Sequence, residues 1–306
     1  MSQVVAILCS DIHLSHRPPG FRSQEVSWYK AMKRPLDEVR ALAEKHQCPI
    51  LCGGDVIDSW KEPAELVNWA IKNLPPIYSV AGNHDTPHHR LDDLHRSAYW
   101  TLVEAGVIRN LAPGRPVEVG SIAIHGFPHG VDPKPLNKKD QHSLALHVAV
   151  VHKYVWTKDT GFERAPEDAR LRNVLKDLDG YDAVLFGDNH KGFLAGKVFN
   201  AGTFYRRKSD EYHYRPCVGL LDFNGKITRH YLDCSQDKYA VFLREGPEKP
   251  DNRTGIEAGE YLEALKDLSG SKVDFEHTLK EELIRRKATT EIRRICKEAM
   301  EKGRLS

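Results

Sequence analysis

Five short apolar stretches of this sequence each run into side chains that can bind a metal ion. The clearest is "FGDNHKG" (186–192), in which Asp188 and His190 stand two residues apart after an apolar run. Residues i and i+2 of an extended chain point to the same side, so both side chains can reach one point. The four other stretches end in Asp11 and His13, in Asp55 and Asp58, in Asn83 and His84, and in His152.

The chemistry of such a set is that of a divalent metal site. Carboxylate, imidazole and amide ligands together suit manganese, iron or zinc better than calcium. The set also holds more ligands than one ion needs, so a carboxylate shared between two ions is the natural solution. Metal pairs of this kind clamp phosphoryl groups and generate a hydroxide nucleophile.

The apolar stretches predict the elements that must position these side chains. In the first half of the chain, strands alternate with segments of helical periodicity, which predicts βαβ units around a largely parallel sheet. The predicted strands there are 4–8, 49–54 and 77–82, and the predicted helices are 24–46, 62–73 and 91–105. Loops at the carboxyl ends of the strands of such a sheet converge on one crevice, so the five stretches are expected to meet.

The second half of the chain is richer in strands. Hairpins are predicted at 116–126 and around Asn224-Gly225, a dipeptide that strongly favours a tight hairpin turn. Buried strands are predicted at 145–152 and 182–187, with a helix at 166–178 between them. Two sheets packed together, with helices outside, are the simplest assembly of these elements.

Length and composition are those of an ordinary globular protein. The 306 residues are 40% hydrophobic and 29% charged, and the net charge of +2 argues neither for nor against a nucleic-acid partner. The six cysteines form no CxxC pair, which favours a reduced, cytoplasmic protein over a disulfide or zinc–cysteine scaffold. No apolar run approaches the ~18 residues of a membrane span, so no membrane association is expected.

The character of the chain changes after about residue 240. Residues 243–255 are rich in proline, glycine and charge and are typical of a linker, whereas 257–269 and 275–302 have helical periodicity. We therefore expect a main domain at 1–240 and a linker with a helical segment at 241–306. The basic, amphipathic helix at its end either packs on its own domain or docks a partner.

The order of the metal-binding motifs resembles that of the calcineurin-like metallophosphoesterases. Asp-x-His, Gly-Asp-x-x-Asp, Gly-Asn-His-Asp, His and Gly-x-x-His follow one another over about residues 5–205, each at the end of a predicted strand. The resemblance implies a four-layer α/β/β/α sandwich of two mixed sheets. It also implies two divalent metal ions and phosphoester hydrolysis by a metal-bound hydroxide.

The resemblance further implies a role for each residue. One metal ion would be held by Asp11, His13, Asp55 and His190, and the other by Asp55, Asn83, His152 and Asp188. His84 would assist departure of the leaving oxygen, and Asp58 would orient the ring of His84. Asp58 is also placed to cap the predicted helix at 62–73.

Asp188 departs from the family pattern, in which the last motif is Gly-His-x-His. A carboxylate in place of an imidazole adds negative charge and hardens the site, which favours manganese or magnesium. We therefore expect Mn²⁺, with Mg²⁺, Fe²⁺ and Zn²⁺ as alternatives.

Within the superfamily, "SDIHLS", "GGDVID" and "GNHD" are most similar to the SbcD-type DNA nucleases. The similarity implies an exonuclease or endonuclease that acts on DNA in repair or recombination. An SbcC-like ATPase partner would then dock on the C-terminal segment, and a homodimer is left open. Two other functions stay open: a phosphoesterase on cyclic nucleotides or phosphomonoesters, and a non-catalytic scaffold of the same fold.

Residues 205–215 interleave basic and aromatic side chains. Basic groups for phosphates beside aromatic faces for unstacked bases are typical of a single-strand groove. Tyr205, Arg206 and Arg207 are accordingly candidate substrate-binding residues. An exposed hairpin arm explains the same composition equally well.

Overall fold

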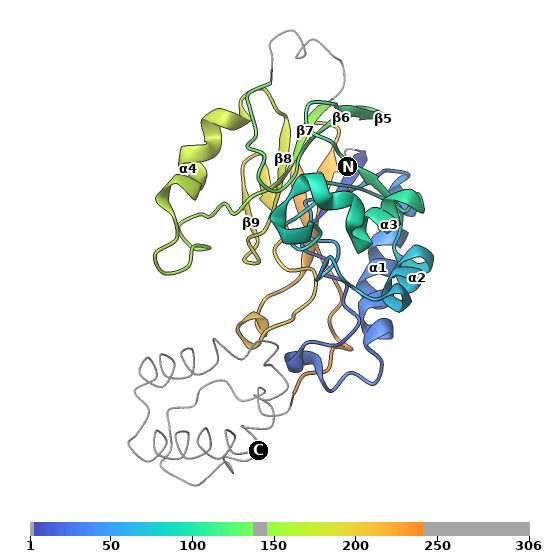
Figure 1. Cartoon of the computed structure of the whole chain (residues 1–306). Coiled ribbons are helices and arrows are strands. Elements are labelled where there is room, and N and C mark those ends of the chain that lie inside the picture. The colour runs from blue at the N-terminus through green and yellow to red at the C-terminus, as the bar shows by residue number, and fades with distance from the viewer. Residues whose placement is uncertain (1–2, 137–145, 241–306) are drawn as a thin grey trace, which may run out of the picture. The chain divides into compact units, whose positions relative to one another are not determined.

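Two six-stranded β-sheets form the centre of the fold in the part of the chain that the structure describes (Figure 1). The computed structural model describes residues 3–136 and 146–240. The predicted linker and helical segment at 241–306, with its proposed partner surface, lie outside the described residues.

The first sheet has the strand order β12-β11-β1-β2-β3-β4. Strands β1 to β4 are parallel to one another, whereas β11 pairs antiparallel with both β1 and β12. The bounds are β1 Val4–Cys9, β2 Ile50–Cys52, β3 Ile77–Ser79, β4 Ile108–Asn110, β11 Cys217–Asp222 and β12 Ile227–Tyr231. The carboxyl ends of β1, β2 and β3 therefore open at the same edge of the sheet.

The second sheet has the order β5-β6-β7-β8-β10-β9. Its four central strands are parallel, and β5 and β9 pair antiparallel at its two edges. The bounds are β5 Val117–Val119, β6 Ile122–Phe127, β7 Leu146–His152, β8 Ala183–Gly187, β9 Phe193–Ala195 and β10 Val198–Asn200.

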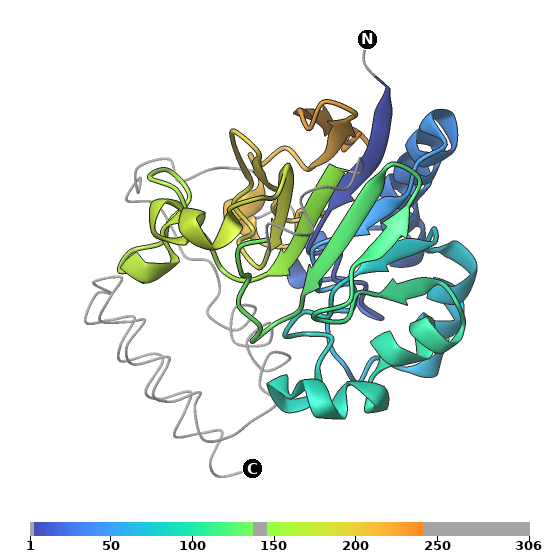
Figure 2. The same ribbon diagram turned by 90° about the horizontal axis from the view of Figure 1, so that it is seen from above.

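Helices cover the outer faces of the two sheets. Helices α1 (Trp28–His46), α2 (Ala64–Asn73) and α3 (Ala98–Glu104) lie on one side and α4 (Leu171–Val174) on the other, as the two views show (Figures 1 and 2). Short 3-10 helices lie at 20–22, 87–89, 91–96, 167–169, 175–178 and 209–211.

Three separate apolar clusters fill the spaces between these layers. One joins α1, α2 and α3 to the first sheet, one lies between the sheets, and one joins α4 to the second sheet. The middle cluster draws on β1, β7 and β8, the strands that also carry site residues at their ends. Three buried interfaces require four layers, which confirms the predicted α/β/β/α sandwich of two mixed sheets.

Most predicted elements are present, with differences at two helices. The predicted helix at 91–105 is a 3-10 helix followed by α3, because the Ser97 side chain accepts the Trp100 N–H at 3.1 Å and starts a new helix there. The predicted helix at 166–178 is broken into α4 between two 3-10 turns. The short strands β4 and β9 had no counterpart in the prediction.

Within residues 3–136 and 146–240, no helix is both long and apolar enough to cross a membrane. The described cysteines are free thiols: Cys9, Cys48, Cys52, Cys217 and Cys234.

Candidate metal centre and substrate pocket

The predicted metal ligands follow the carboxyl ends of β1, β2, β3, β7 and β8. The loops after β1 and β2 are fastened together, because the backbone N–H groups of Asp11 and His13 donate to the carbonyls of Gly54 and Asp55 at 3.0 and 2.8 Å. Tight turns direct the side chains: Asp11, His13, Asp55 and Asp188 all have positive φ, between 47° and 84°. Non-glycine residues rarely adopt this backbone conformation, which clusters at functional sites.

Glycine is required where the segments meet most closely. A Cβ on Gly82 would lie 2.0 Å from Asp55 Oδ1, and one on Gly54 would lie 2.4 Å from His152 Nδ1. Any larger residue would displace the carboxylate or the imidazole. These two glycines therefore let three strand ends approach one point.

The first group of metal donors comprises Asp11, His13 and His190. The Nε2 atoms of His13 and His190 lie 3.2 Å apart, and His190 Nε2 is 3.9 Å from Asp11 Oδ1. Two nitrogens bound to one ion at about 2.1 Å lie roughly 3.0–3.4 Å apart, so the imidazole spacing fits a shared ion. Asp11 Oδ2 is buried and has no hydrogen-bond partner among the described residues, so it too is available as a ligand.

Burial shifts the pKa of both Asp11 and His13. It lowers the pKa of His13 to about 4 and raises the pKa of Asp11 to about 6. The His13 ring is consequently neutral at pH 7, as a metal ligand must be.

The second group of donors comprises Asp11, Asp55 and His152, with Asn83 beside it. His152 Nε2 lies 3.6 Å from Asp55 Oδ1 and 2.9 Å from Asn83 Oδ1, while its Nδ1 donates to the Gly53 carbonyl at 2.6 Å. Burial alone would lower the pKa of His152, but the surrounding carboxylates, Asp55 foremost, raise that pKa to about 9. The carboxylates therefore attract a cation to this position, which is what a metal site requires.

Asp55 lies between the two groups. Its Oδ2 is 3.6 Å from His13 Nε2, and its Oδ1 faces His152 at the same distance. The Oδ1 atom also accepts the His84 N–H at 2.9 Å, which fixes the carboxylate. A carboxylate placed in this way can bridge two ions, so the donor set fits the predicted metal pair.

His84 stands on the rim of the centre, with its side chain 42% exposed. Its Nδ1 lies 2.6 Å from the backbone carbonyl of Asp58, a hydrogen bond that directs Nε2 away from this partner. The Asp58 carboxylate was predicted to orient this ring, but its Oδ1 is 3.9 Å from His84 Nδ1 and only 3.2 Å from His13 Nδ1. The carboxylate thus faces His13, and the backbone of the same residue holds His84.

The carboxylate of Asp58 is also ion-paired with Arg207. Burial would raise the pKa of Asp58, but His13 and Arg207 together lower that pKa to about 2. The carboxylate is charged at any physiological pH, and its position beside Nδ1 favours the His13 tautomer that carries its proton on that atom. This leaves the His13 Nε2 lone pair for a metal ion.

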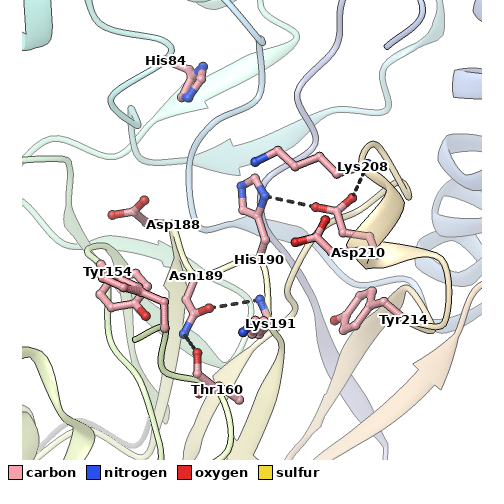
Figure 3. A pocket seen from close by; sticks show the side chains of 12 residues that line it. His84, Tyr154, Thr160, Asp188, Asn189, His190, Lys191, Lys208, Asp210 and Tyr214 are labelled. Carbon is pink, nitrogen blue, oxygen red and sulfur yellow. Dashed lines mark hydrogen bonds and ion pairs between the residues drawn. The ribbon is translucent and has the colours of Figure 1, made fainter. Parts of the chain in front are cut away.

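Asp188 is brought to the centre by its backbone rather than by its carboxylate. Its N–H donates to Asp11 Oδ1 at 3.0 Å. Its side chain belongs neither to the two donor groups above nor to the third that the described residues form, which is His13, Asp58 and His84. The side chain lines the adjoining pocket instead (Figure 3). It is still close enough to help raise the pKa of His152.

Two of the three predicted substrate-binding residues serve the fold. Tyr205 is only 3% exposed and donates to the Met32 carbonyl at 3.1 Å, so its ring is part of the core and offers no face to a base. Arg206 donates to the Tyr214 carbonyl at 2.6 Å and to the Tyr239 hydroxyl at 2.8 Å. Arg207 alone of the three lies beside the metal centre, through Asp58.

Sequence reasoning missed three residues that support the site. Asp85 is fully buried and accepts the N–H groups of Ile57 and Gly82, both at 2.9 Å, so it joins the loops after β2 and β3. Glu211 Oε1 lies 3.5 Å from His190 Nδ1. His129 lies with its ring 6.1 Å from that of His152. Asp85 belongs to the "GNHD" motif and was therefore visible, whereas nothing near Glu211 or His129 in the sequence marks them.

A pocket of about 380 Å³ opens beside the metal centre (Figure 3). His84 and His190 line the pocket together with Asp188, Asn189 and Lys191. Tyr154 and Thr160 lie on one side of His190, and Lys208 and Tyr214 lie on the other. A substrate whose phosphate sits at the metal centre can therefore place an attached group here.

The family of the chain follows from this fold, this site and the sequence. The chain belongs to the calcineurin-like phosphoesterase family, whose sequence model matches residues 5–192. The predicted membership of the superfamily is confirmed, and the protein is a metallophosphoesterase with donor groups for divalent metal ions.

Several solved structures are similar to the chain at low sequence identity. The calcineurin-like phosphoesterase YfkN from Bacillus subtilis is 13% identical, with 66% of this chain and 82% of that chain covered and a TM-score of 0.40. An archaeal phosphodiesterase is 14% identical, with 74% and 99% covered and a TM-score of 0.36. The protein TT1561 of Thermus thermophilus is 13% identical, with 76% and 99% covered and a TM-score of 0.43. No curated protein matches the sequence.

Proposed function

We propose that the protein hydrolyses phosphodiester bonds in DNA with two divalent metal ions. Mn²⁺ is the metal ion that we propose first. The proposal that the protein is a two-metal hydrolase rests on the position of Asp55. Its two carboxylate oxygens face two separate groups of metal donors. A metal pair held there supplies charge neutralisation for the phosphate and an activated water as the nucleophile.

The chain's own residues would complete the reaction around the phosphate. His84 is held through Nδ1 by the Asp58 carbonyl, and it lines the pocket, so its Nε2 is placed to give a proton to the leaving oxygen. Asp58, whose Oδ1 lies 3.2 Å from His13 Nδ1, would favour the His13 tautomer that leaves Nε2 free. Arg207, paired with Asp58 beside the centre, is the remaining candidate for contact with a phosphate oxygen.

DNA as the substrate is supported by the resemblance of "SDIHLS", "GGDVID" and "GNHD" to the SbcD-type nucleases. Exonuclease and endonuclease action are both compatible with this proposal. An SbcC-like partner on the C-terminal segment and a homodimer stay predictions.

A second candidate is a phosphodiesterase on small substrates. The pocket of about 380 Å³ lies within the size range of small-molecule sites and matches a nucleotide better than a long strand. The burial of Tyr205 also removes part of the predicted single-strand groove.

Hydrolysis assays with a matched histidine control test the proposal. The full chain with MnCl₂ is given bis-p-nitrophenyl phosphate, p-nitrophenyl phosphate, and end-labelled single- and double-stranded DNA. His84→Ala should lower kcat by roughly 10²–10⁴-fold with metal content unchanged. His95→Ala is the control, because the Nδ1 of His95 also bonds a backbone carbonyl, that of Asp92, away from the metal centre.

Each outcome distinguishes the alternatives. Cleavage of DNA that is lost in His84→Ala supports the nuclease, and cleavage of the small diester without cleavage of DNA supports the second candidate. A metal-loaded chain without activity on either diester contradicts both and leaves the scaffold of the same fold.

A further inference from the structure

Two aromatic rings lie next to each other on the loop that follows β7 and line the pocket. The rings of Tyr154 and Phe162 have centroids 5.2 Å apart, with their planes inclined at 51°. Phe162 is 54% exposed, although a phenylalanine gains most from burial. Both residues line the pocket, so their exposed faces are available to whatever enters it.

The loop that carries these rings is fastened to the metal centre. Asn189 is buried, and its side-chain amide donates to the Val155 carbonyl at 2.8 Å and to the Thr160 carbonyl at 3.3 Å. Asn189 directly precedes the metal donor His190, so the backbone of the loop that carries the aromatic rings is anchored beside the metal centre. Asn189, which lies between Asp188 and His190, therefore has a structural role that metal binding does not explain.

The charges of the pocket argue against a second phosphate. Lys191 and Lys208 line it, but so do Asp188, Asp210 and Glu211. Positive charges are therefore outnumbered by carboxylates beyond the metal ions. A neutral group attached to a single phosphate fits this balance better than a polyphosphate or a bisphosphate does.

We propose that this pocket binds the nucleobase of the nucleotide whose phosphate lies at the metal centre, stacked on the wall formed by Tyr154 and Phe162. The proposal rests on the proposed function, because it takes a phosphate ester at the metal centre as given. Aromatic side chains stack on any base, since every base offers a flat face. The pocket volume of about 380 Å³ and the lining lysines and carboxylates leave room and polar partners for the sugar.

Binding of two ligands that differ by the base tests this directly. Thymidine 5′-monophosphate and 2-deoxyribose 5-phosphate are titrated by calorimetry into the full chain supplied with MnCl₂. The nucleotide should bind about tenfold more tightly, because stacking of one base contributes roughly 1–3 kcal/mol, or about 5–150-fold. Phe162→Ala should remove most of this difference, and Phe162→Trp should keep it.

Phe223→Ala is the matched control. Phe223 is 54% exposed, like Phe162, but lies at the hairpin between β11 and β12 and does not line the pocket. This variant should bind both ligands as the wild type does. Equal affinity of the wild type for the two ligands, or a difference that survives in Phe162→Ala, would overturn the proposal.

The titration separates this proposal from the proposed function. Failure to hydrolyse bis-p-nitrophenyl phosphate contradicts the phosphodiesterase but does not alter how the two ligands bind. Conversely, hydrolysis of diesters with no preference for the base-bearing ligand contradicts the nucleobase pocket alone.

Discussion

Replacing Asp58 with asparagine removes one largely buried charge beside the metal centre and keeps the size of the side chain. In the wild type the carboxylate is paired with Arg207, and its Oδ1 lies 3.2 Å from His13 Nδ1. Although burial opposes ionisation, these two contacts bring the pKa of Asp58 from 3.8 to about 2. At about 1.4 kcal/mol for each pKa unit, the folded protein favours the charged form by about 2 kcal/mol.

We therefore expect metal-free Asp58→Asn to lose about 2 kcal/mol of unfolding free energy at pH 7. The folded-state pKa is depressed, so this contribution is complete above the unfolded pKa and is lost as the pH falls through about 2. The difference from wild type should shrink to about half at pH 3, as measured by urea denaturation at both pH values. Asp37→Asn, which breaks a half-exposed ion pair with Lys33, is the control and should cost less than about 1 kcal/mol.

The same substitution tests which histidine the Asp58 carboxylate serves. Loss of a charged partner that orients a metal-binding imidazole typically weakens metal binding by roughly 10–100-fold, so Asp58→Asn should bind Mn²⁺ at least about tenfold more weakly by calorimetry. His84 keeps its partner, because that partner is the Asp58 backbone carbonyl. The pH dependence of kcat at saturating manganese should therefore be unchanged. Unaltered metal affinity with a shifted pH dependence would refute this reasoning and return the carboxylate to His84.

Two further substitutions test the ligand set and the packing of the domain. If Asp188 is a metal ligand, as the sequence predicts, Asp188→Ala should bind one metal ion and Asp188→His should bind two. The ions are counted by elemental analysis. Two ions in Asp188→Ala would show that Asp188 only lines the pocket. Away from the metal centre, burial would raise the pKa of Glu25, but contacts with the backbone of Lys238 and with Arg22 lower that pKa. The stability that the Glu25 carboxylate contributes is therefore present above its ordinary pKa of 4.5 and is lost in acid. Glu25→Gln should consequently be less stable than wild type at pH 7 and nearer to it at pH 3, by urea denaturation.

The convergence of the five metal-binding segments was predictable, because it depends only on the order of the strands and on their alternation with helices. Each predicted ligand follows a strand that reads as an apolar run, and parallel strands open at one edge. The partners of those ligands were not predictable from local sequence. Asp58 faces His13 because Arg207, 149 positions further along the chain, holds its carboxylate. Glu211 reaches His190 through a loop whose course no periodicity reveals.

In the segment 205–215 the sequence suggested a function that the structure does not support for every residue. Its basic and aromatic composition predicted a surface for nucleic acid, yet Tyr205 packs in the core beside α1. Composition does not distinguish an aromatic ring that faces solvent from one that faces a helix. The pair formed by the exposed Phe162 and the partly buried Tyr154 was not predictable from the sequence, because eight positions separate the two residues and no spacing links them.

Charge balance at the metal centre supplies an argument about the substrate that does not depend on sequence resemblance. Asp55, Asp11 and Asp188 all raise the pKa of His152, so three carboxylates act on one position. Two divalent ions would bring four positive charges, which the three carboxylates and the hydroxide nucleophile together balance once His152 is neutral. A phosphodiester then adds one negative charge to the centre, whereas a phosphomonoester dianion adds two and is favoured less. Asp188→Asn removes one carboxylate charge and should shift the ratio of kcat/KM for bis-p-nitrophenyl phosphate over p-nitrophenyl phosphate toward the monoester. An unchanged ratio would show that shape rather than charge selects the ester.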